Sequence, residues 1–162
     1  FMMNIKHSIP AAAAAMMMLS ACMPIKGRPI NTTNLEQVKH ICIRPNPKSD
    51  FPDWSRQLRL ALQKEGVSSQ VIDPRGAAPE NCRYDLIYKA FNTGQSADTL
   101  ESASLVIRDN KRQRVGLIKY KLRGEAQQQF VNQPNLQAQT DMLIKRMFKY
   151  KYPTNAHSIT VE

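Results

Sequence analysis

The chain has 162 residues, enough for one domain with a single hydrophobic core and too few for two domains of ordinary size. It carries 23 Lys and Arg residues against 13 Asp and Glu residues, and the formal charge of +10 favours anionic partners. The longest apolar run, residues 9–19, is shorter than the roughly 20 residues that cross a bilayer. These properties exclude a polytopic membrane protein and leave no need for a metal to support the fold.

An export signal is predicted over residues 1–21. The apolar run follows Lys6, contains five alanines and three consecutive methionines, and ends at Ser20 and Ala21, directly before Cys22. A positively charged start, a short apolar region and a cleavage site with small residues are typical of a signal peptide. We therefore expect cleavage between Ala21 and Cys22, which leaves a chain with 22 basic and 13 acidic residues, or +9.

Residues 22–36 are predicted to be a flexible tether, because Pro, Gly and small polar residues are mixed there without any period. A single α/β domain is expected over residues 37–152 and a tail over 153–162. The domain begins with a strand, Val38–Arg44, followed by an amphipathic helix of about fifteen residues between Pro52 and Gly66. A short strand, Ser69–Ile72, then completes a β-α-β unit.

The second half predicts a long third strand, a hairpin and a closing helix. Tyr84, Leu86, Tyr88 and Ala90 alternate along residues 82–91, residues 103–109 and 114–122 are rich in β-forming residues, and a helical pattern runs from Pro134 to about residue 149. The order is then β-α-β-β-β-β-α. We expect a two-layer α/β sandwich with a four- to five-stranded mixed sheet and two helices on one face.

Candidate catalytic and metal sites are weak. His40 and Cys42 share a strand face, but their Cα atoms are roughly 6.6 Å apart and no third orienting group is near them in sequence. The histidines and cysteines lack the paired spacing of a structural zinc site. We therefore predict no catalytic residue, no metal and no cofactor, and assign Trp54, Tyr84 and Tyr88 to the core.

A basic cluster near the C-terminus is the strongest local indication of an interaction. Phe148, Tyr150 and Tyr152 alternate there with four cations, Lys145, Arg146, Lys149 and Lys151. In one interpretation the aromatic side chains pack inward and the cations form a solvated helix face. In the other, the cations contact anionic lipid head groups or wall polymer.

The chain resembles a group of small proteobacterial lipoproteins. The resemblance is carried by five short motifs: Leu19-Ser20-Ala21-Cys22, Cys42-Ile43, Asn46-Pro47, the alternation from Cys82 to Ala90, and Gly116-x-x-x-Tyr120. The chain lacks the tryptophan-rich third strand of that group. It implies that Cys22 becomes lipidated with palmitate-type acyl chains and is the first residue of the mature protein. Met23 and Pro24 follow without the aspartate that retains enteric relatives at the inner membrane, which implies the periplasmic side of the outer membrane.

Two cysteines remain if Cys22 carries lipid. An even number of cysteines in an oxidising compartment predicts a disulfide between Cys42 and Cys82, worth about 3 to 4 kcal/mol on the chain-entropy model. The alternative is two buried thiols that never meet.

These features predict a lipid-anchored envelope lipoprotein that acts without catalysis, as an accessory or assembly factor. Its partners would be the membrane, through the anchor, and an envelope protein or peptidoglycan. One alternative is an envelope enzyme whose carboxylates, such as Asp85 and Glu101, are brought together only by the fold. Others are a basic module that binds anionic lipid or wall polymer and a cytosolic nucleic-acid binder, the last of which an export signal disfavours.

Overall fold

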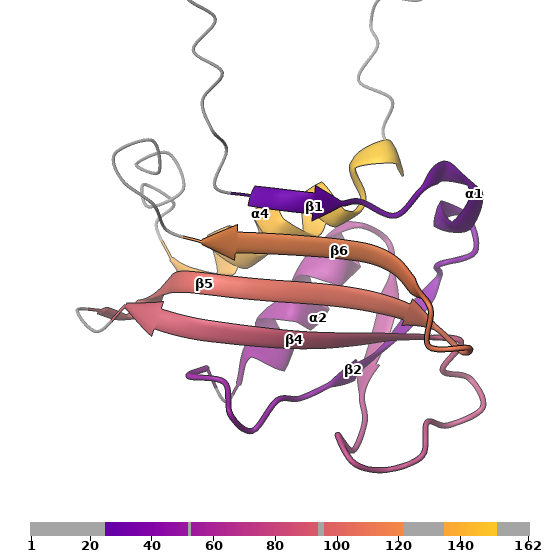
Figure 1. Cartoon of the computed structure of the whole chain (residues 1–162), viewed down its shortest axis with the longest axis horizontal. Helices are drawn as coiled ribbons and strands as arrows, with labels where there is room; N and C mark the ends of the chain where they lie inside the picture. Colours follow the sequence, from indigo (N-terminus) through magenta and orange to yellow (C-terminus); the bar gives the residue numbers. More distant parts are fainter. Residues whose placement is uncertain (1–24, 52, 94–95, 122–134, 152–162) are drawn as a thin grey trace, which may run out of the picture.

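The computed structural model describes residues 25–51, 53–93, 96–121 and 135–151. The predicted signal peptide, Cys22 and the tail 153–162 lie outside the described residues. A six-stranded mixed sheet forms one layer, and α2 and α4 cover one of its faces (Figure 1). The two-layer α/β architecture is therefore confirmed.

The strands follow each other across the sheet in the order β1-β6-β5-β4-β2-β3. Parallel pairing joins β2 to both β3 and β4, and antiparallel pairing joins the other neighbours. Their bounds are β1 Ile25–Arg28, β2 His40–Arg44, β3 Ser68–Val71, β4 Tyr84–Thr93, β5 Ser96–Asp109 and β6 Arg114–Lys121.

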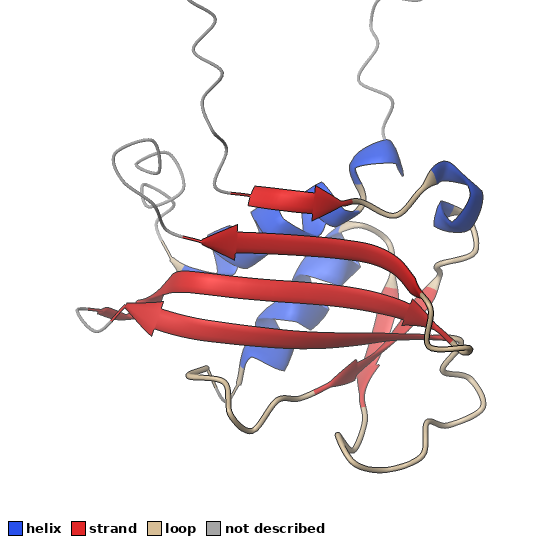
Figure 2. Cartoon of the chain, in the orientation of Figure 1, coloured by secondary structure: helices blue, strands red, loops and turns tan. Residues whose placement is uncertain are grey.

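The helical layer consists of α2, Trp54–Lys64, and α4, Leu136–Met147, followed by the 3-10 helix η2, Lys149–Lys151. A short helix, α1, spans Thr32–Leu35 and is capped by the Asn31 side chain, which accepts a hydrogen bond from the Asn34 backbone N–H. Figure 2 shows both long helices behind the sheet. Within the described residues, no helix is long and apolar enough to cross a membrane.

The predicted strand count and element order were wrong, because both β1 and α1 precede the predicted domain. Ile25–Arg28, which the sequence placed in a flexible tether, pairs with β6 as an edge strand. Gly27 makes this possible: its φ is +142°, and a Cβ atom there would lie 2.0 Å from the Leu117 carbonyl oxygen. Residues 25–36 therefore belong to the domain, and β1 has too few apolar residues to be predicted from periodicity.

The core lies between the sheet and the helices. Ile41, Ile43, Leu86 and Leu105 point into it from the strands and are fully buried. Trp54 is also fully buried; its indole N–H donates to Thr140 Oγ1 at 2.8 Å, and its ring meets Tyr88 edge-on at 5.0 Å. The assignment of the three aromatic residues to the core is thus confirmed.

Candidate functional site: the open face of the sheet

The face of the sheet away from α2 and α4 has no described helix over it, and we call it the open face. Strand pairing arranges its side chains in rows that run across the strands. One row is Arg28, Leu117, Val106, Ile87 and Arg44; the next is Lys26, Lys119, Ser104 and Lys89. Side chains directly opposite each other on paired strands have Cβ atoms about 5 Å apart, so each row is a contiguous strip.

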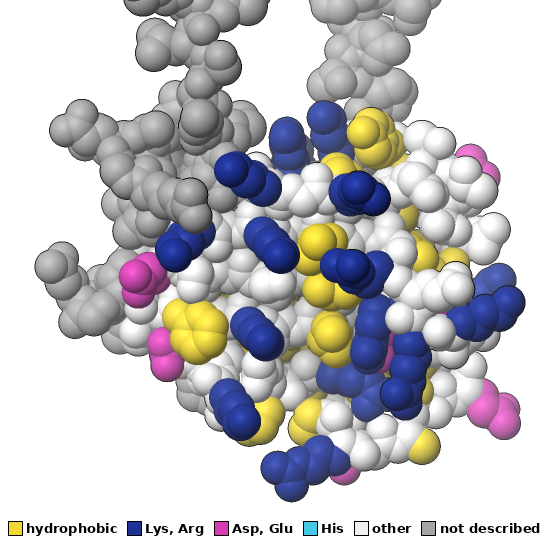
Figure 3. Space-filling model, in the orientation of Figure 1, with side chains coloured by type: hydrophobic (Ala, Val, Ile, Leu, Met, Phe, Trp, Pro, Cys, Tyr) yellow, Lys and Arg dark blue, Asp and Glu magenta, His cyan; other side chains and the backbone are white. Residues whose placement is uncertain are grey.

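Basic side chains dominate this face. Figure 3 views it directly and shows Lys and Arg side chains spread over the strands, with a smaller hydrophobic group between them. Ile87, Val106 and Leu117 form that apolar strip and are half-buried. A sheet face that no described helix covers, with an apolar centre and a cationic surround, is suited to hold an anionic partner.

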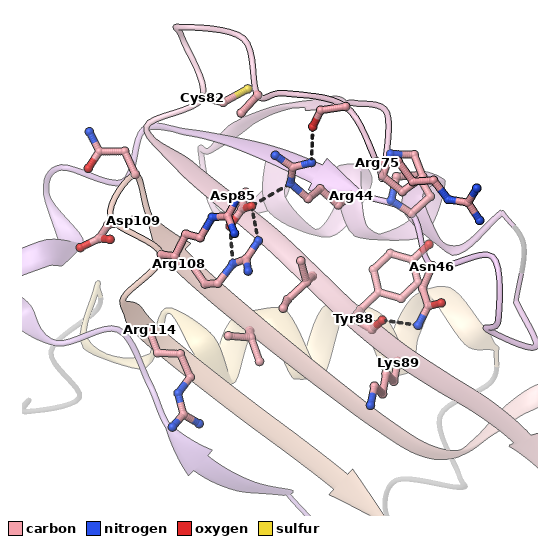
Figure 4. A pocket seen from close by; sticks show the side chains of 18 of the residues that line it. Arg44, Asn46, Arg75, Cys82, Asp85, Tyr88, Lys89, Arg108, Asp109 and Arg114 are labelled. Atoms are coloured by element: carbon pink, nitrogen blue, oxygen red, sulfur yellow. Dashed lines mark hydrogen bonds and ion pairs between the residues drawn. The ribbon is translucent and has the colours of Figure 1, made fainter.

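The arginine end of the open face comprises Arg44, Arg75, Arg108 and Arg114, with Asp85 between them (Figure 4). Arg108 Nε donates to Asp85 Oδ1 at 2.9 Å, and Arg44 Nε donates to Asp85 Oδ2 at 2.9 Å. The three side chains are only 12–22% exposed. Because two guanidinium groups share one carboxylate, this cluster keeps a net charge of about +1, from the always-protonated state of arginine.

The Arg44 guanidinium also fixes the neighbouring loop. Its Nη1 donates to the Gly76 carbonyl oxygen at 3.0 Å and to that of Asp73 at 3.3 Å. Hydrogen bonding to Asp85 raises the pKa of Arg108, and this outweighs the opposing effect of burial. Hydrogen bonds thus fix the positions of both guanidinium groups.

An open hollow with a volume of 1140 Å³ lies over this part of the face and extends along it to Lys89 and Lys119. Strands β4, β5 and β6 contribute its floor, and the loop 74–80 and the turn 109–112 contribute residues at its border. Asp109 accepts hydrogen bonds from the backbone N–H groups of Lys111 and Gln113, each at 2.9 Å, and so stabilises its own turn. The hollow thus has ordered walls, and most of the charged residues that line it are basic.

A disulfide borders the hollow. Cys42 on β2 and Cys82, just before β4, are joined with their Cα atoms 5.5 Å apart, as the cysteine count predicts. Because Cys42 is bonded in this way, it has no thiol to act as a nucleophile. His40 instead shares a 2.7 Å hydrogen bond, through Nδ1, with Ser68 Oγ.

The carboxylates proposed for an enzyme are not brought together. Asp85 pairs with Arg108, seven residues along β5 from Glu101, a separation of about 23 Å in an extended strand. Among the described residues, no three His, Cys, Asp or Glu side chains form a group that could hold a metal ion.

The predicted basic cluster near the C-terminus belongs to the helical layer. Lys145 and Arg146 are in the last turn of α4, and Lys149 lies with its Nζ 5.6 Å from the centre of the Tyr150 ring. Phe148 is buried, as the solvated-face interpretation expects, but Tyr150 is 48% exposed, so the expectation that the aromatic side chains pack inward is wrong for that residue. Lys151 is in η2, and its side chain lies outside the described residues.

Sequence reasoning missed the open face, because its cations come from five strands, β1, β2, β4, β5 and β6, that are spread along the sequence. A usable pattern was present. On the predicted strands, some of the positions that alternate with core residues carry basic side chains, such as Lys89 on β4, Arg108 on β5 and Lys119 on β6. One apolar face and one cationic face on neighbouring strands predict a basic sheet surface.

Comparisons with known proteins are sparse. Neither a protein-family model nor a curated protein sequence matches the chain. A solved dodecamer of PelC from Paraburkholderia phytofirmans aligns with 76% of this chain and 94% of its own, at 13% sequence identity and a TM-score of 0.46. At that TM-score the likeness establishes neither a shared fold nor a shared function.

Proposed function

We propose that this chain is a lipid-anchored, periplasm-facing envelope lipoprotein, held at the outer membrane through Cys22, that acts without catalysis as a binding or assembly component of an envelope complex. Its domain binds an anionic partner on the open face, with carboxylate or phosphate groups seated at the arginine end. The observation that carries the proposal is the contiguous cationic surface on a sheet face that no described helix covers.

The arginine end supports recognition of an anionic group in particular. Guanidinium groups bind carboxylates and phosphates with directed hydrogen bonds, and they do so best when their geometry is fixed before binding. Asp85 holds Arg44 and Arg108 in place, while Arg75 and Arg114 are exposed beside them. The rigid pair would supply local positive potential, and the exposed pair would reach the ligand.

The enzyme alternative is less well supported by this geometry. A general acid or base needs a titratable group that is placed to exchange a proton with substrate. Asp85 is committed to two arginines, and Asp109 accepts backbone hydrogen bonds within its own turn. Neither carboxylate is available for that role in this arrangement.

Binding of poly-L-glutamate to the mature chain tests the site. Arg75→Gln combined with Arg114→Gln should weaken binding about 20-fold, since an exposed cation contributes on the order of 1 kcal/mol, or roughly fivefold, at an anionic surface. The matched control is Arg56→Gln combined with Arg59→Gln, which removes the same charge from exposed positions on α2. Equal losses in the two double variants would show that only net charge matters and would contradict the site.

Lipid attachment requires a separate test. Incorporation of labelled palmitate into the protein in the envelope should disappear in Cys22→Ser. Labelling that persists in that variant would contradict the anchor.

A further inference from the structure

The other end of the open face has a different composition, and we call it the lysine end. It comprises Lys26 on β1, Lys119 and Lys121 on β6, and Lys89 and Phe91 on β4. Lys26 and Lys119 are direct cross-strand partners, and Lys119 and Lys89 flank Ser104. These three lysines are exposed, and Phe91 is 43% exposed.

Such an arrangement is unfavourable for the isolated domain. Like charges directly opposite each other on paired strands are destabilising. A phenylalanine side chain that remains in water also forgoes the free energy of burial. One environment relieves both: an anionic interface that is negatively charged at its surface and apolar just below it.

The chain path brings this end close to the predicted anchor. Ile25, the first residue of β1, pairs with Tyr120 between Lys119 and Lys121. Only three residue steps separate Cys22 from Ile25, so a fully extended backbone spans at most about 11 Å between them. A lipidated Cys22 would therefore hold the lysine end about one Debye length from the head groups, where electrostatic attraction is still strong.

We propose that the lysine end is a membrane-contact surface that binds anionic phospholipid. Lys26, Lys119 and Lys89 contact the head-group phosphates, and Phe91 inserts at the boundary with the acyl chains. The inference rests on the lipid anchor of the proposed function. Asp85 at the arginine end and Lys89 at the lysine end are four residues, or about 13 Å, apart along β4. The inference therefore assigns different tasks to the two ends of one sheet face.

This contact would orient the domain. With the lysine end on the head groups, the arginines of the arginine end lie on the part of the face farther from the anchor, accessible to a partner in the periplasm. Lys89 and Lys119 also line the hollow, so the hollow extends from the arginine end to the edge of the lysine end. Glu101, exposed on β5 next to Ser102, is a carboxylate near this end. It limits the net attraction without removing the excess of lysines.

Co-sedimentation with phospholipid vesicles tests the surface without the anchor. The protein is the mature chain from residue 22 carrying Cys22→Ser, and the vesicles are phosphatidylcholine with or without one-third phosphatidylglycerol. Binding is expected only to the anionic vesicles. Lys26→Gln combined with Lys119→Gln should weaken it about 20-fold, at roughly fivefold per lysine near the surface.

Three further variants separate the mechanisms. Phe91→Ser should lower binding about fivefold, and unlike the lysine effect this ratio should persist in high salt, because burial of apolar area is not screened. Two control pairs remove the same charge elsewhere on the domain: Arg75→Gln with Arg114→Gln, and Lys145→Gln with Lys149→Gln. Vesicle binding of each control pair should stay within about twofold of the parent. Thermal unfolding of each variant verifies that it is folded.

The inference would be overturned if either control pair lost as much vesicle binding as the lysine-end pair. It would also be overturned if the parent bound neutral and anionic vesicles equally. The outcome is independent of the poly-L-glutamate test. If the vesicle test fails and the poly-L-glutamate test succeeds, only the membrane-contact surface is ruled out. If the vesicle test succeeds and the poly-L-glutamate test fails, the partner site is ruled out.

Discussion

Asp85 on β4 binds Arg108 on β5 through both carboxylate oxygens, with Nε 2.9 Å from Oδ1 and Nη2 2.5 Å from Oδ2. The same carboxylate accepts a hydrogen bond from Arg44 on β2. One acidic side chain thus links three neighbouring strands at the arginine end of the open face. Its negative charge offsets the repulsion between these two arginines, which lie on the same face of the sheet.

Asp85→Asn should lower the free energy of unfolding by about 2 kcal/mol, because it leaves two partly buried guanidinium groups without their counter-ion. Urea denaturation measures the change. The matched control is Asp141→Asn, which removes a salt bridge to Lys64, a side chain that is 59% exposed. That loss should stay below about 1 kcal/mol, and a comparable effect in both variants would contradict a special role for Asp85.

Gly27→Ala should detach β1 from the sheet. The backbone at Gly27 has a positive φ, and the new methyl group would overlap the Leu117 carbonyl oxygen, at a free-energy penalty of about 1–3 kcal/mol. Hydrogen exchange should accelerate in β1 while β4 and β5 keep their protection. At Gly76, which has no positive φ and whose nearest contact is the Asp73 side chain at 3.1 Å, alanine should have a smaller effect.

Alkaline pH should destabilise the domain through Tyr120. This side chain is 2% exposed, and burial raises its pKa from 10.0 to about 12. A group whose pKa is raised in the folded state stabilises fully below its unfolded pKa, and the contribution is lost as the pH rises through the folded value. The loss should therefore occur between pH 10 and 12, at up to about 1.4 kcal/mol per pH unit.

The measurement is the free energy of unfolding against pH for the parent and for Tyr120→Phe. The variant should show a shallower decline over that window, since phenylalanine does not titrate. Parallel curves would contradict burial as the source of the shift.

The double variant Cys42→Ala with Cys82→Ala should lower the free energy of unfolding by about 3 to 4 kcal/mol, because the disulfide closes a loop across 40 residues of sequence. Mass spectrometry of the mature protein without reductant gives an independent check: the bonded form is lighter by two hydrogens. Two free thiols in periplasmic material would contradict the bond.

The elements with a clear period were predictable from the sequence. Trp54, Leu58 and Leu62 predicted α2 because they repeat at helical spacing, and the alternation from Tyr84 to Ala90 predicted β4. β1 was not predictable, since backbone pairing to β6 and the conformation of Gly27 define it rather than any apolar pattern. The order of the strands in the sheet was not predictable either, because it depends on which strands pair with each other along their edges.

The candidate site was predictable only in part. The disulfide followed from the number of cysteines and the predicted compartment. The arginine end did not, because Arg44 and Arg108 are 64 residues apart in sequence and meet only through Asp85. A charge cluster within one segment, such as Lys145 to Lys149, is visible directly in a sequence. For one assembled across strands, the sequence shows only the alternating basic positions and not which strands are neighbours.

The central claim, that the open face is where this protein meets an envelope partner, is tested most directly by photo-crosslinking in intact envelopes. A benzophenone side chain would replace Arg114 on the open face or, as the control, Arg59 on α2, both exposed. The account predicts a discrete crosslinked adduct from position 114 and none from position 59. Adducts from position 59 alone, or from neither position, would contradict it.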